Sequence, residues 1–317
     1  MFEPGSLVVV ACSGGPDSLC LLHAMVRLRR LLRFELACFH FDHALREGST
    51  RDAAYVRGQA RRLGIPVFER HASSKPARGE SVEAWARTVR YAALREVLEE
   101  LGGGAAAVAH TSDDQAETVL LALLRGGGLE ALAGMPPVAR PIIRPLLDVT
   151  REQTIAFCRA LGLRPRRDPM NEDPRFMRVS IRTRVIPEVE RGLGRGVRGT
   201  LARTAALLRQ DAEFLEGLAV EAVAGIVEAH PSGAVLLRAD TLAGLPQPIS
   251  SRVVRRLLLG LGVAAEAAHV QAILDLAAGR GGRTVSLPGG LRGRRAGEYV
   301  RVSRPSPGPR STEPPPV

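Results

Sequence analysis

The residues with the strongest chemical potential follow directly after an apolar segment. Residues 7–12 are almost entirely apolar, and the next six residues read Ser-Gly-Gly-Pro-Asp-Ser. A turn that leads from a buried strand into a helix leaves backbone N–H groups unpaired, and the helix dipole adds positive potential there. Glycines allow a positive φ and a close approach to the backbone, and serine hydroxyls add donors. This pattern predicts an anion site formed by Ser13, Gly14, Gly15, Pro16, Asp17 and Ser18; the alternative is a glycine turn with an ordinary helix cap.

Two more polar clusters follow predicted strands, at residues 40–46 and 110–117. The carboxyl ends of parallel strands meet at one edge of a sheet, so we expect both clusters to lie beside residues 13–18. Asp17 stands at the start of the predicted helix, where it can cap the helix or hold a cation.

Short apolar runs alternate with helix-length amphipathic segments in the first half of the chain. The expected strands are residues 7–12, 36–41, 66–70 and 105–110, and the expected helices are residues 17–32, 50–63, 82–101 and 113–124. The strands show no alternation of apolar and polar residues, which is typical of a parallel sheet covered on both faces. The predicted fold class is therefore α/β, with a doubly wound, mostly parallel sheet.

The second half of the chain differs from the first in its pattern of predicted elements. We predict a catalytic domain over 1–187, a helical linker over 188–230, a small mixed C-terminal domain over 231–304 and a disordered Pro-rich tail over 305–317. Within the C-terminal domain, residues 234–246 suggest a strand and a turn. Residues 249–262 and 267–279 suggest helices, and residues 283–304 suggest strands around a Pro-Gly-Gly turn.

The charge balance favours a polyanionic partner. The net charge is +11, and residues 140–184 contain eleven Arg against five acidic residues. A basic surface of this kind favours nucleic acid, although a basic protein without such a partner is the alternative. The four cysteines lie in apolar runs without a C-x-x-C pair, so we expect core residues rather than a metal site or disulfides. No apolar run is long enough to span a bilayer and no secretion signal is visible, which predicts a cytoplasmic protein without a membrane partner.

The first loop lacks the Lys of a Walker A sequence and the spacing of a dinucleotide loop. Its S-G-G-x-D-S pattern resembles the pyrophosphate loop of the N-type ATP pyrophosphatases. The segments "HFDHALREGSTRDAAYV", "ESVEAWARTVRYAAL", "AHTSDDQAETVLLALLRGGGLEALAGM" and 142–190 together resemble the tRNA(Ile)-lysidine synthetase family. The resemblance covers residues 7–190 strongly and 231–303 more loosely. Thr111, Met170 and Val179 depart from common family residues.

The resemblance implies a reaction. ATP adenylates the C2 oxygen of the wobble cytidine in the CAU anticodon of tRNA(Ile), pyrophosphate leaves, and the amine of free L-lysine then displaces AMP. The product, lysidine, changes codon reading from AUG to AUA. The loop would hold ATP together with His43 and Arg46, with Mg²⁺ bridging the phosphates. The resemblance implies Asp17, Asp113 and Asp114 as ligands of this ion, which is commonly bound by one or two carboxylates. The alternative for Asp113 and Asp114 is N-capping of the following helix. The residues expected to act in catalysis are Asp17, Asp42, Arg90 and Asp113. Family resemblance also implies that the domain over 231–304 recognises the tRNA, and it makes a homodimer an expectation.

Two further sets of residues are expected to bind the other substrates. Glu83 and Glu117 are candidate carboxylates for the lysine substrate, and the sequence does not choose between them. The tRNA backbone would contact arginines that fix position without reading sequence: Arg164, Arg166, Arg167, Arg175, Arg178, Arg182 and Arg184. Arg87 lies three residues before Arg90, so both can reach one site.

Three rival functions remain at this point. A tRNA 2-thiolase on the same fold generally uses paired cysteines, and no C-x-x-C is present. An ammonia-using synthetase such as NAD synthetase needs neither the Arg-rich segment nor the added domain. A non-catalytic RNA-binding protein would not need the intact loop or the Asp113–Asp114 pair, so the presence of both argues against this function.

Overall fold

The predicted parallel sheet is present and is wound in both directions from its first strand. The computed structural model describes residues 3–45, 48–166, 173, 175–194, 196–229, 234–279 and 281–304. Among these, β1 (Leu7–Ala11), β2 (Glu35–Asp42), β3 (Val67–His71), β4 (Ala105–Ala107), β5 (Val138–Ala139) and β6 (Ile142–Ile143) form one sheet in the order β3-β2-β1-β4-β6-β5. All neighbouring strands are parallel except β5 and β6. The chain moves outward from β1 to β3 and then returns to β4 on the other side of β1, so the strand order reverses between β1 and β4.

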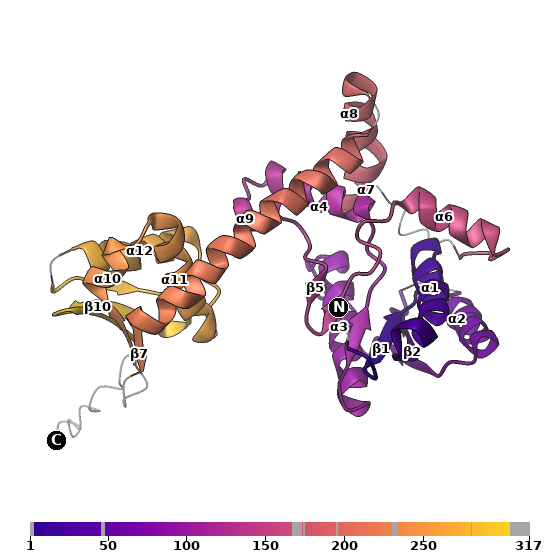
Figure 1. Ribbon diagram of the computed structural model, residues 1–317, viewed down its shortest axis with the longest axis horizontal. Coiled ribbons are helices and arrows are strands. Elements are labelled where there is room, and N and C mark those ends of the chain that lie inside the picture. The colour runs from indigo at the N-terminus through magenta and orange to yellow at the C-terminus, as the bar shows by residue number, and fades with distance from the viewer. Residues whose placement is uncertain are drawn as a thin grey trace, which may run out of the picture. The chain divides into compact units, whose positions relative to one another are not determined.

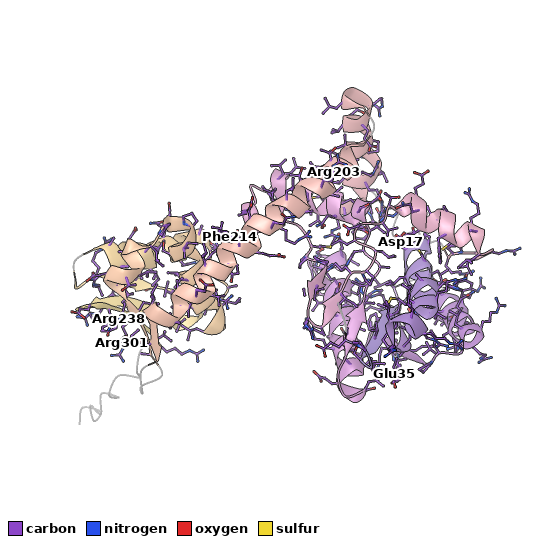
Figure 2. The ribbon with its side chains drawn as sticks, viewed as in Figure 1. Asp17, Glu35, Arg203, Phe214, Arg238 and Arg301 are labelled. Carbon is purple, nitrogen blue, oxygen red and sulfur yellow. The ribbon has the colours of Figure 1, made fainter. Side chains whose placement is uncertain are left out.

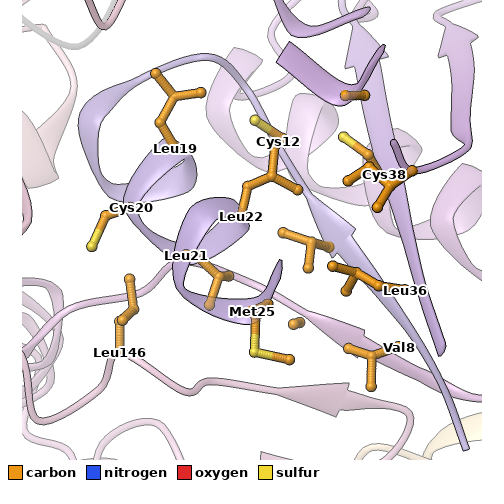
Figure 3. Packing of buried hydrophobic residues seen from close by; sticks show 14 of the residues in the cluster. Val8, Cys12, Leu19, Cys20, Leu21, Leu22, Met25, Leu36, Cys38 and Leu146 are labelled. Atoms are coloured by element: carbon orange, nitrogen blue, oxygen red, sulfur yellow. The ribbon is translucent and has the colours of Figure 1, made fainter. Parts of the chain in front are cut away.

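Helices cover both faces of this sheet, as expected for α/β winding (Figure 1). Alternate residues of β1 separate the two cores. Val8 and Val10 pack with α1 (Pro16–Leu32) and α2 (Ser49–Leu63), and Val9 packs with α3 (Val82–Glu100). The four cysteines are buried without a disulfide, which confirms their predicted place in the core. Figure 3 shows Cys12 and Cys38 among the side chains packed between α1, β1 and β2.

Each element before residue 125 lies within three residues of its predicted bounds, whereas the short elements between residues 129 and 185 were not predicted. Helix α4 spans Ser112–Leu124, and α5 spans Leu129–Leu132. Helix α6 (Arg151–Ala160) begins at a capping box in which Thr150 is the N-cap and Gln153 the N3 residue. Then α7 (Met177–Ser180), a π-helical turn at Ile181–Val185 and α8 (Ile186–Leu193) lead to the 30-residue helix α9 (Val197–Ile226).

The chain divides into two units, Met1–Arg209 and Gln210–Val317, with the division inside α9. The four-part division predicted from the sequence stays a prediction. No helix in the described part of the chain is long and apolar enough to cross a membrane.

The second unit is a small antiparallel sheet packed against helices. Strands β7 (Val227–Ala229), β8 (Val235–Arg238), β9 (Thr284–Ser286), β10 (Arg292–Ala296) and β11 (Tyr299–Ser303) pair in the order β7-β8-β11-β10-β9. Helices α10 (Ala239–Gly244), α11 (Gln247–Gly260) and α12 (Ala267–Ala278) contribute to its core, together with Ala219 and Ile226 of α9. The Pro-Gly-Gly turn joins β9 to β10 as predicted. The turn expected after β8 is wrong, because residues 239–244 form α10 instead.

Close packing of β10 against α12 makes Gly293 sensitive to substitution. A Cβ at this position would lie 2.7 Å from Ile273 Cδ1 and 3.0 Å from Val285 Cγ2. Gly293→Ala is therefore expected to destabilise the second unit by about 1–3 kcal/mol. Gly217→Ala is the control, since nothing lies within 4 Å of its Cβ in α9 and alanine favours a helix. Urea titration of the two variants, followed by hydrogen exchange in residues 210–317, measures the stability of the second unit in each. Equal urea midpoints for the two variants would contradict this packing.

Candidate active site

A cavity of about 750 Å³ lies where the strand order reverses. Its walls come from the segments that follow β1, β2 and β4 and from α3, α4, the start of α6, α7 and the π-helical turn. Ligands of open α/β sheets bind at this place. The sequence-predicted residues that line the cavity are Ser13, Gly15, Pro16, Asp17, Ser18, Asp42, His43, Glu83, Arg90, Asp114, Glu117, Arg166, Arg178 and Arg182.

The loop after β1 is folded around the hydroxyl of Ser18. This hydroxyl accepts a hydrogen bond from the Ser13 N–H at 3.2 Å and donates one to the Gly15 carbonyl at 3.0 Å. Gly14 has a φ of +85°, and its carbonyl accepts a hydrogen bond from the Arg166 N–H at 2.9 Å. Helix α1 begins at Pro16, with Gly15 as its N-cap and no side-chain cap, so the predicted alternative of capping by Asp17 is wrong. The first-turn N–H groups therefore stay available to an anion.

Arg151 holds together the carboxylates that follow β1 and β4. Its guanidinium lies 3.3 Å from Asp17 Oδ2, 3.0 Å from Asp114 Oδ1 and 3.7 Å from Glu117 Oε1. Thr154, one turn further along α6, donates its hydroxyl to Asp17 Oδ1. The start of α6 thus fixes three carboxylates around one cation.

Burial and mutual repulsion shift the pKa values of these carboxylates apart. Burial raises the pKa of Asp17, and the Asp114 charge raises it further against the effects of Thr154 and Arg151. Burial also raises the pKa of Glu117, which is 2% exposed, to about 7, again with a contribution from Asp114. Burial acts in the same direction on Asp114, but Arg151 and the Thr111 N–H outweigh it and lower its pKa. Carboxyl groups with separated pKa values are typical of sites that move protons.

Asp113 does not share the position of its neighbour. Its carboxylate accepts a hydrogen bond from the Arg151 backbone N–H at 2.8 Å and lies 3.4 Å from Arg198 Nε, and it is not among the residues that line the cavity. Neither aspartate is the N-cap of α4, which is Thr111, so the predicted alternative of N-capping is wrong for Asp113. It holds in part for Asp114, which is the N3 partner in the capping box and accepts a hydrogen bond from the Thr111 N–H.

Basic side chains from α3 also line the cavity. The guanidinium groups of Arg87 and Arg90 lie 5.0 and 5.5 Å from the centre of the Tyr91 ring, so the two arginines do reach one site. Burial lowers the pKa of Arg90, and burial lowers that of His110 to about 3, so His110 is neutral. Among the described residues, His110 Nδ1 has no hydrogen-bond partner although it is buried.

The residues after β2 are held by local contacts. Asp42 accepts a hydrogen bond from the Ala44 N–H at 2.8 Å. The His43 ring packs edge-on against Phe41, at 4.8 Å between centroids, and lies 6.3 Å from the ring of buried Trp85. Arg46 lies outside the described residues.

The seven arginines predicted to bind tRNA fall into two groups. Arg166, Arg178 and Arg182 line the cavity and lie near acidic residues: Arg166 is 2.9 Å from Asp52, Arg178 is 3.5 Å from Glu83, and Arg182 is 3.9 Å from Glu117. Arg164, Arg175 and Arg184 are exposed and do not line the cavity, and Arg166 is exposed as well. Arg175 pairs with its neighbour Asp173 at 2.7 Å. Arg167 lies outside the described residues.

Sequence reasoning missed Arg151 and Thr154, and it placed His110 in the cluster after β4 without giving it a role. The capping-box pattern around Thr150 would have located the start of α6, but not the cavity that this start faces. In the described part of the chain, no group of three or more His, Cys, Asp and Glu side chains is arranged to hold a metal ion. Asp17 and Asp114 nevertheless fit Mg²⁺, because this ion is commonly bound by one or two carboxylates together with phosphates and water.

The fold and the loop define a PP-loop ATP pyrophosphatase. The family described as PP-loop domain matches residues 3–189. The solved structure of the U34-tRNA thiolase NcsA from Methanococcus maripaludis is similar with a TM-score of 0.54 at 17% identity, covering 65% of this chain and 74% of that one. This likeness concerns the fold alone.

The particular family follows from the whole chain. The TilS substrate binding domain matches residues 237–304. The tRNA(Ile)-lysidine synthase of Salinispora tropica is 43% identical over 95% of this chain and 91% of its own length. That of Thermobifida fusca is 41% identical over 94% and 92%. The chain belongs to the tRNA(Ile)-lysidine synthase family, as its motifs predicted.

The raised pKa of Glu117 makes a prediction about stability. Its ordinary value is 4.5 and its folded value about 7. At pH values between these two, the folded chain keeps a proton that the unfolded chain has released. The free energy by which Glu117 destabilises the folded state therefore grows as pH rises, and it reaches its full size above pH 7. Glu117→Gln is expected to match the wild type near pH 4.5 and to be more stable at pH 8, by at most about 3 kcal/mol.

Urea midpoints of both proteins at the two pH values measure this difference. Glu83→Gln is the control, because Glu83 is exposed. If the urea midpoints of Glu117→Gln and the wild type differ by the same amount at both pH values, Glu117 does not titrate in this range.

Proposed function

We propose that this protein uses ATP to adenylate C2 of the wobble cytidine in the CAU anticodon of tRNA(Ile) and then joins free L-lysine to that carbon. The observation that carries the proposal is the arrangement of the SGGPDS loop and the carboxylates Asp17, Asp114 and Glu117 around one cavity of a chain in this family. We place the reaction in the cytoplasm. The homodimer expected from the family stays a prediction.

In the first step, the loop binds the phosphates of ATP. The first-turn N–H groups of α1 and the hydroxyl of Ser13 face the cavity and can donate to phosphate oxygens. His43 and Arg46 belong to the proposed ATP site, and Asp42 holds the chain after β2 beside it. Arg90 is a fixed positive group for the phosphate charge that builds up as the C2 oxygen of cytidine attacks the α-phosphorus and pyrophosphate leaves.

Mg²⁺ would neutralise and align the phosphates, held by Asp17 and Asp114. Arg151 now contacts the same two carboxylates. We propose that Arg151 balances their charge before ATP enters. Asp113 acts indirectly, because its carboxylate accepts a hydrogen bond from the backbone N–H of Arg151 and so fixes that residue.

In the second step, an amine of lysine attacks C2, the C2–O bond breaks, and AMP leaves with the oxygen. The amine must be neutral when it attacks, and a proton must leave it. Glu117 suits both tasks, because its carboxylate faces the cavity and its pKa of about 7 is matched to proton transfer near neutral pH. Glu83 is a weaker candidate, since it is exposed and Arg178 lies 3.5 Å away.

The tRNA contributes a base that must leave its stack to reach the cavity. We assign contacts with its phosphates at the cavity to Arg166, Arg178 and Arg182. Arg164, Arg175 and Arg184 are proposed to contact phosphates outside the cavity, and Arg167 belongs to the same proposed set. These contacts position the RNA and do not read its sequence.

The test of the reaction is incorporation of radiolabelled lysine into unmodified tRNA(Ile) with the CAU anticodon, with the methionine tRNA as control. ATP-dependent label in the isoleucine tRNA alone is expected. Pyrophosphate release with RNA but no lysine incorporation would point to another nucleophile on the same fold.

Asp17→Ala is expected to lower adenylation by about a hundredfold or more, since it removes a carboxylate from the phosphate site. Its dissociation constant for tRNA should stay within about twofold of wild type, because phosphate contacts of the RNA lie on arginines. Pyrophosphate release and filter binding measure the two. Retained adenylation would remove Asp17 from the ATP site.

Two matched variants separate the lysine-binding candidates. Glu117→Gln is expected to raise the KM for lysine by about tenfold and to lower the rate of the second step, while adenylation persists. Glu83→Gln is expected to change the same KM by less than about threefold. Lysine titrations at saturating ATP and tRNA decide this, and the reverse order would assign the site to Glu83.

A further inference from the structure

The first turn of α9 carries an arginine that contacts three separate segments of the first unit. Arg198 Nε lies 3.4 Å from the carboxylate of Asp113 at the start of α4, and its Nη1 lies 2.5 Å from that of Glu190 in α8. Its Nη2 donates a hydrogen bond to the Arg182 carbonyl, in the π-helical turn, at 3.4 Å. Each nitrogen of this guanidinium therefore contacts a different segment.

The Arg182 carbonyl needs a side-chain donor because it lies in the π-helical turn. In an α-helix this carbonyl would accept a hydrogen bond from the N–H four residues later, but the Ile186 N–H is donated to Ile181 instead. The residue five positions later is Pro187, which has no N–H. Arg198 therefore supplies a hydrogen bond that neither of these two positions provides.

The contacts of Arg198 close a ring around Glu117. Asp113 lies beside Arg198 and accepts a hydrogen bond from the Arg151 backbone N–H at 2.8 Å. The Arg151 guanidinium lies 3.7 Å from Glu117 Oε1. The guanidinium of Arg182 lies 3.9 Å from the same oxygen. Arg198 thus fixes the backbone of one flanking arginine directly and that of the other through Asp113.

Glu117 depends on these two arginines more than the other carboxylates of the cavity do. Asp17 accepts the Thr154 hydroxyl, and Asp114 accepts the Thr111 N–H at 2.8 Å. By contrast, Glu117 Oε1 is buried and has no hydrogen-bond partner among the described residues. A displacement of the flanking arginines should therefore affect Glu117 first.

We propose that Arg198 is a positioning residue for the transfer of lysine, an inference that rests on the proposed function. Arg198 does not line the cavity, so it acts through Arg151 and Arg182. These two cations fix the surroundings in which Glu117 receives the proton of the attacking amine. A small misplacement of such a group lowers the rate, because proton transfer requires a defined geometry. Adenylation should depend less on Arg198, since Asp17 and Asp114 have hydrogen bonds of their own.

The test compares two arginine variants of the same helix. Arg198→Met removes the three polar contacts and keeps an unbranched side chain. Arg203→Met is the matched control, because Arg203 lies on α9 (Figure 2), is exposed and donates a hydrogen bond to Thr200 at 3.1 Å. Both variants lose one positive charge, so a general weakening of tRNA attraction appears in both. Pyrophosphate release without lysine measures adenylation, and radiolabelled lysine incorporation measures the complete reaction.

In Arg198→Met, lysine incorporation is expected to fall by about tenfold, whereas pyrophosphate release should change by less than about threefold. Arg203→Met should leave the ratio of the two rates unchanged. A loss of folded enzyme would lower both rates by the same factor, so this ratio separates positioning from stability. Equal losses in the two steps of Arg198→Met would overturn the proposal.

A double variant tests the route through Asp113. If Arg198 acts through that carboxylate, Arg198→Met combined with Asp113→Asn should lose no more lysine incorporation than the larger of the two single losses. Single losses that multiply in the double variant would show that the two residues act independently, and would overturn this route.

Hydrogen exchange at the Arg151 amide distinguishes this inference from the proposed function. In Arg198→Met this N–H should exchange faster than in the wild type, because Asp113 is no longer held beside it. Faster exchange, together with a wild type that incorporates no lysine, would refute the proposed function and leave the contact of Arg198 with Asp113 in place. Unchanged exchange with normal lysine incorporation in Arg198→Met would refute the role of Arg198 alone.

Discussion

The site depends on one constraint, which is that three partly buried carboxylates cannot stay charged together without a cation between them. Arg151 meets this need, because one guanidinium contacts Asp17, Asp114 and Glu117. Asp17 follows β1 and the other two follow β4, so the same contact ties together the two segments that flank the reversal of strand order. The same guanidinium group therefore balances the charge of the site and fixes the position of its loops. Breaking a buried ion pair by removing one partner is costly, which keeps this arrangement in place.

The cavity that results is lined by two kinds of charged group. Carboxylates with separated pKa values come from the start of α1 and from α4, whereas Arg87 and Arg90 come from α3 and the neutral His110 follows β4. A two-step reaction benefits from this division. Phosphate charge is stabilised by fixed cations in the first step, and a proton is removed from an amine by a carboxylate in the second.

The sequence predicted the central elements well, since the apolar runs of β1 to β4 and the amphipathic helices between them carry strong periodic signals. Strands β5 and β6 have two residues each, which is too short for any period to show. Asp113 and Asp114 were given one role because they are adjacent, but neighbouring positions on a helix do not face each other. The role of Arg151 could not be predicted from the sequence, because its partner Asp17 is 134 residues away along the chain. Only the packing of α6 against α1 brings the two side chains together.

The almost complete absence of lysine from the chain gains meaning from the composition of the cavity wall. The sequence holds one lysine, Lys75, and the basic residues that line the cavity are arginines and histidines. An adenylated base is an electrophile that any neutral amine can capture. Guanidinium groups keep their protons in proteins and cannot compete for it. The wall thus supplies positive charge without supplying a rival nucleophile, so the activated tRNA is protected from becoming attached to the enzyme that made it.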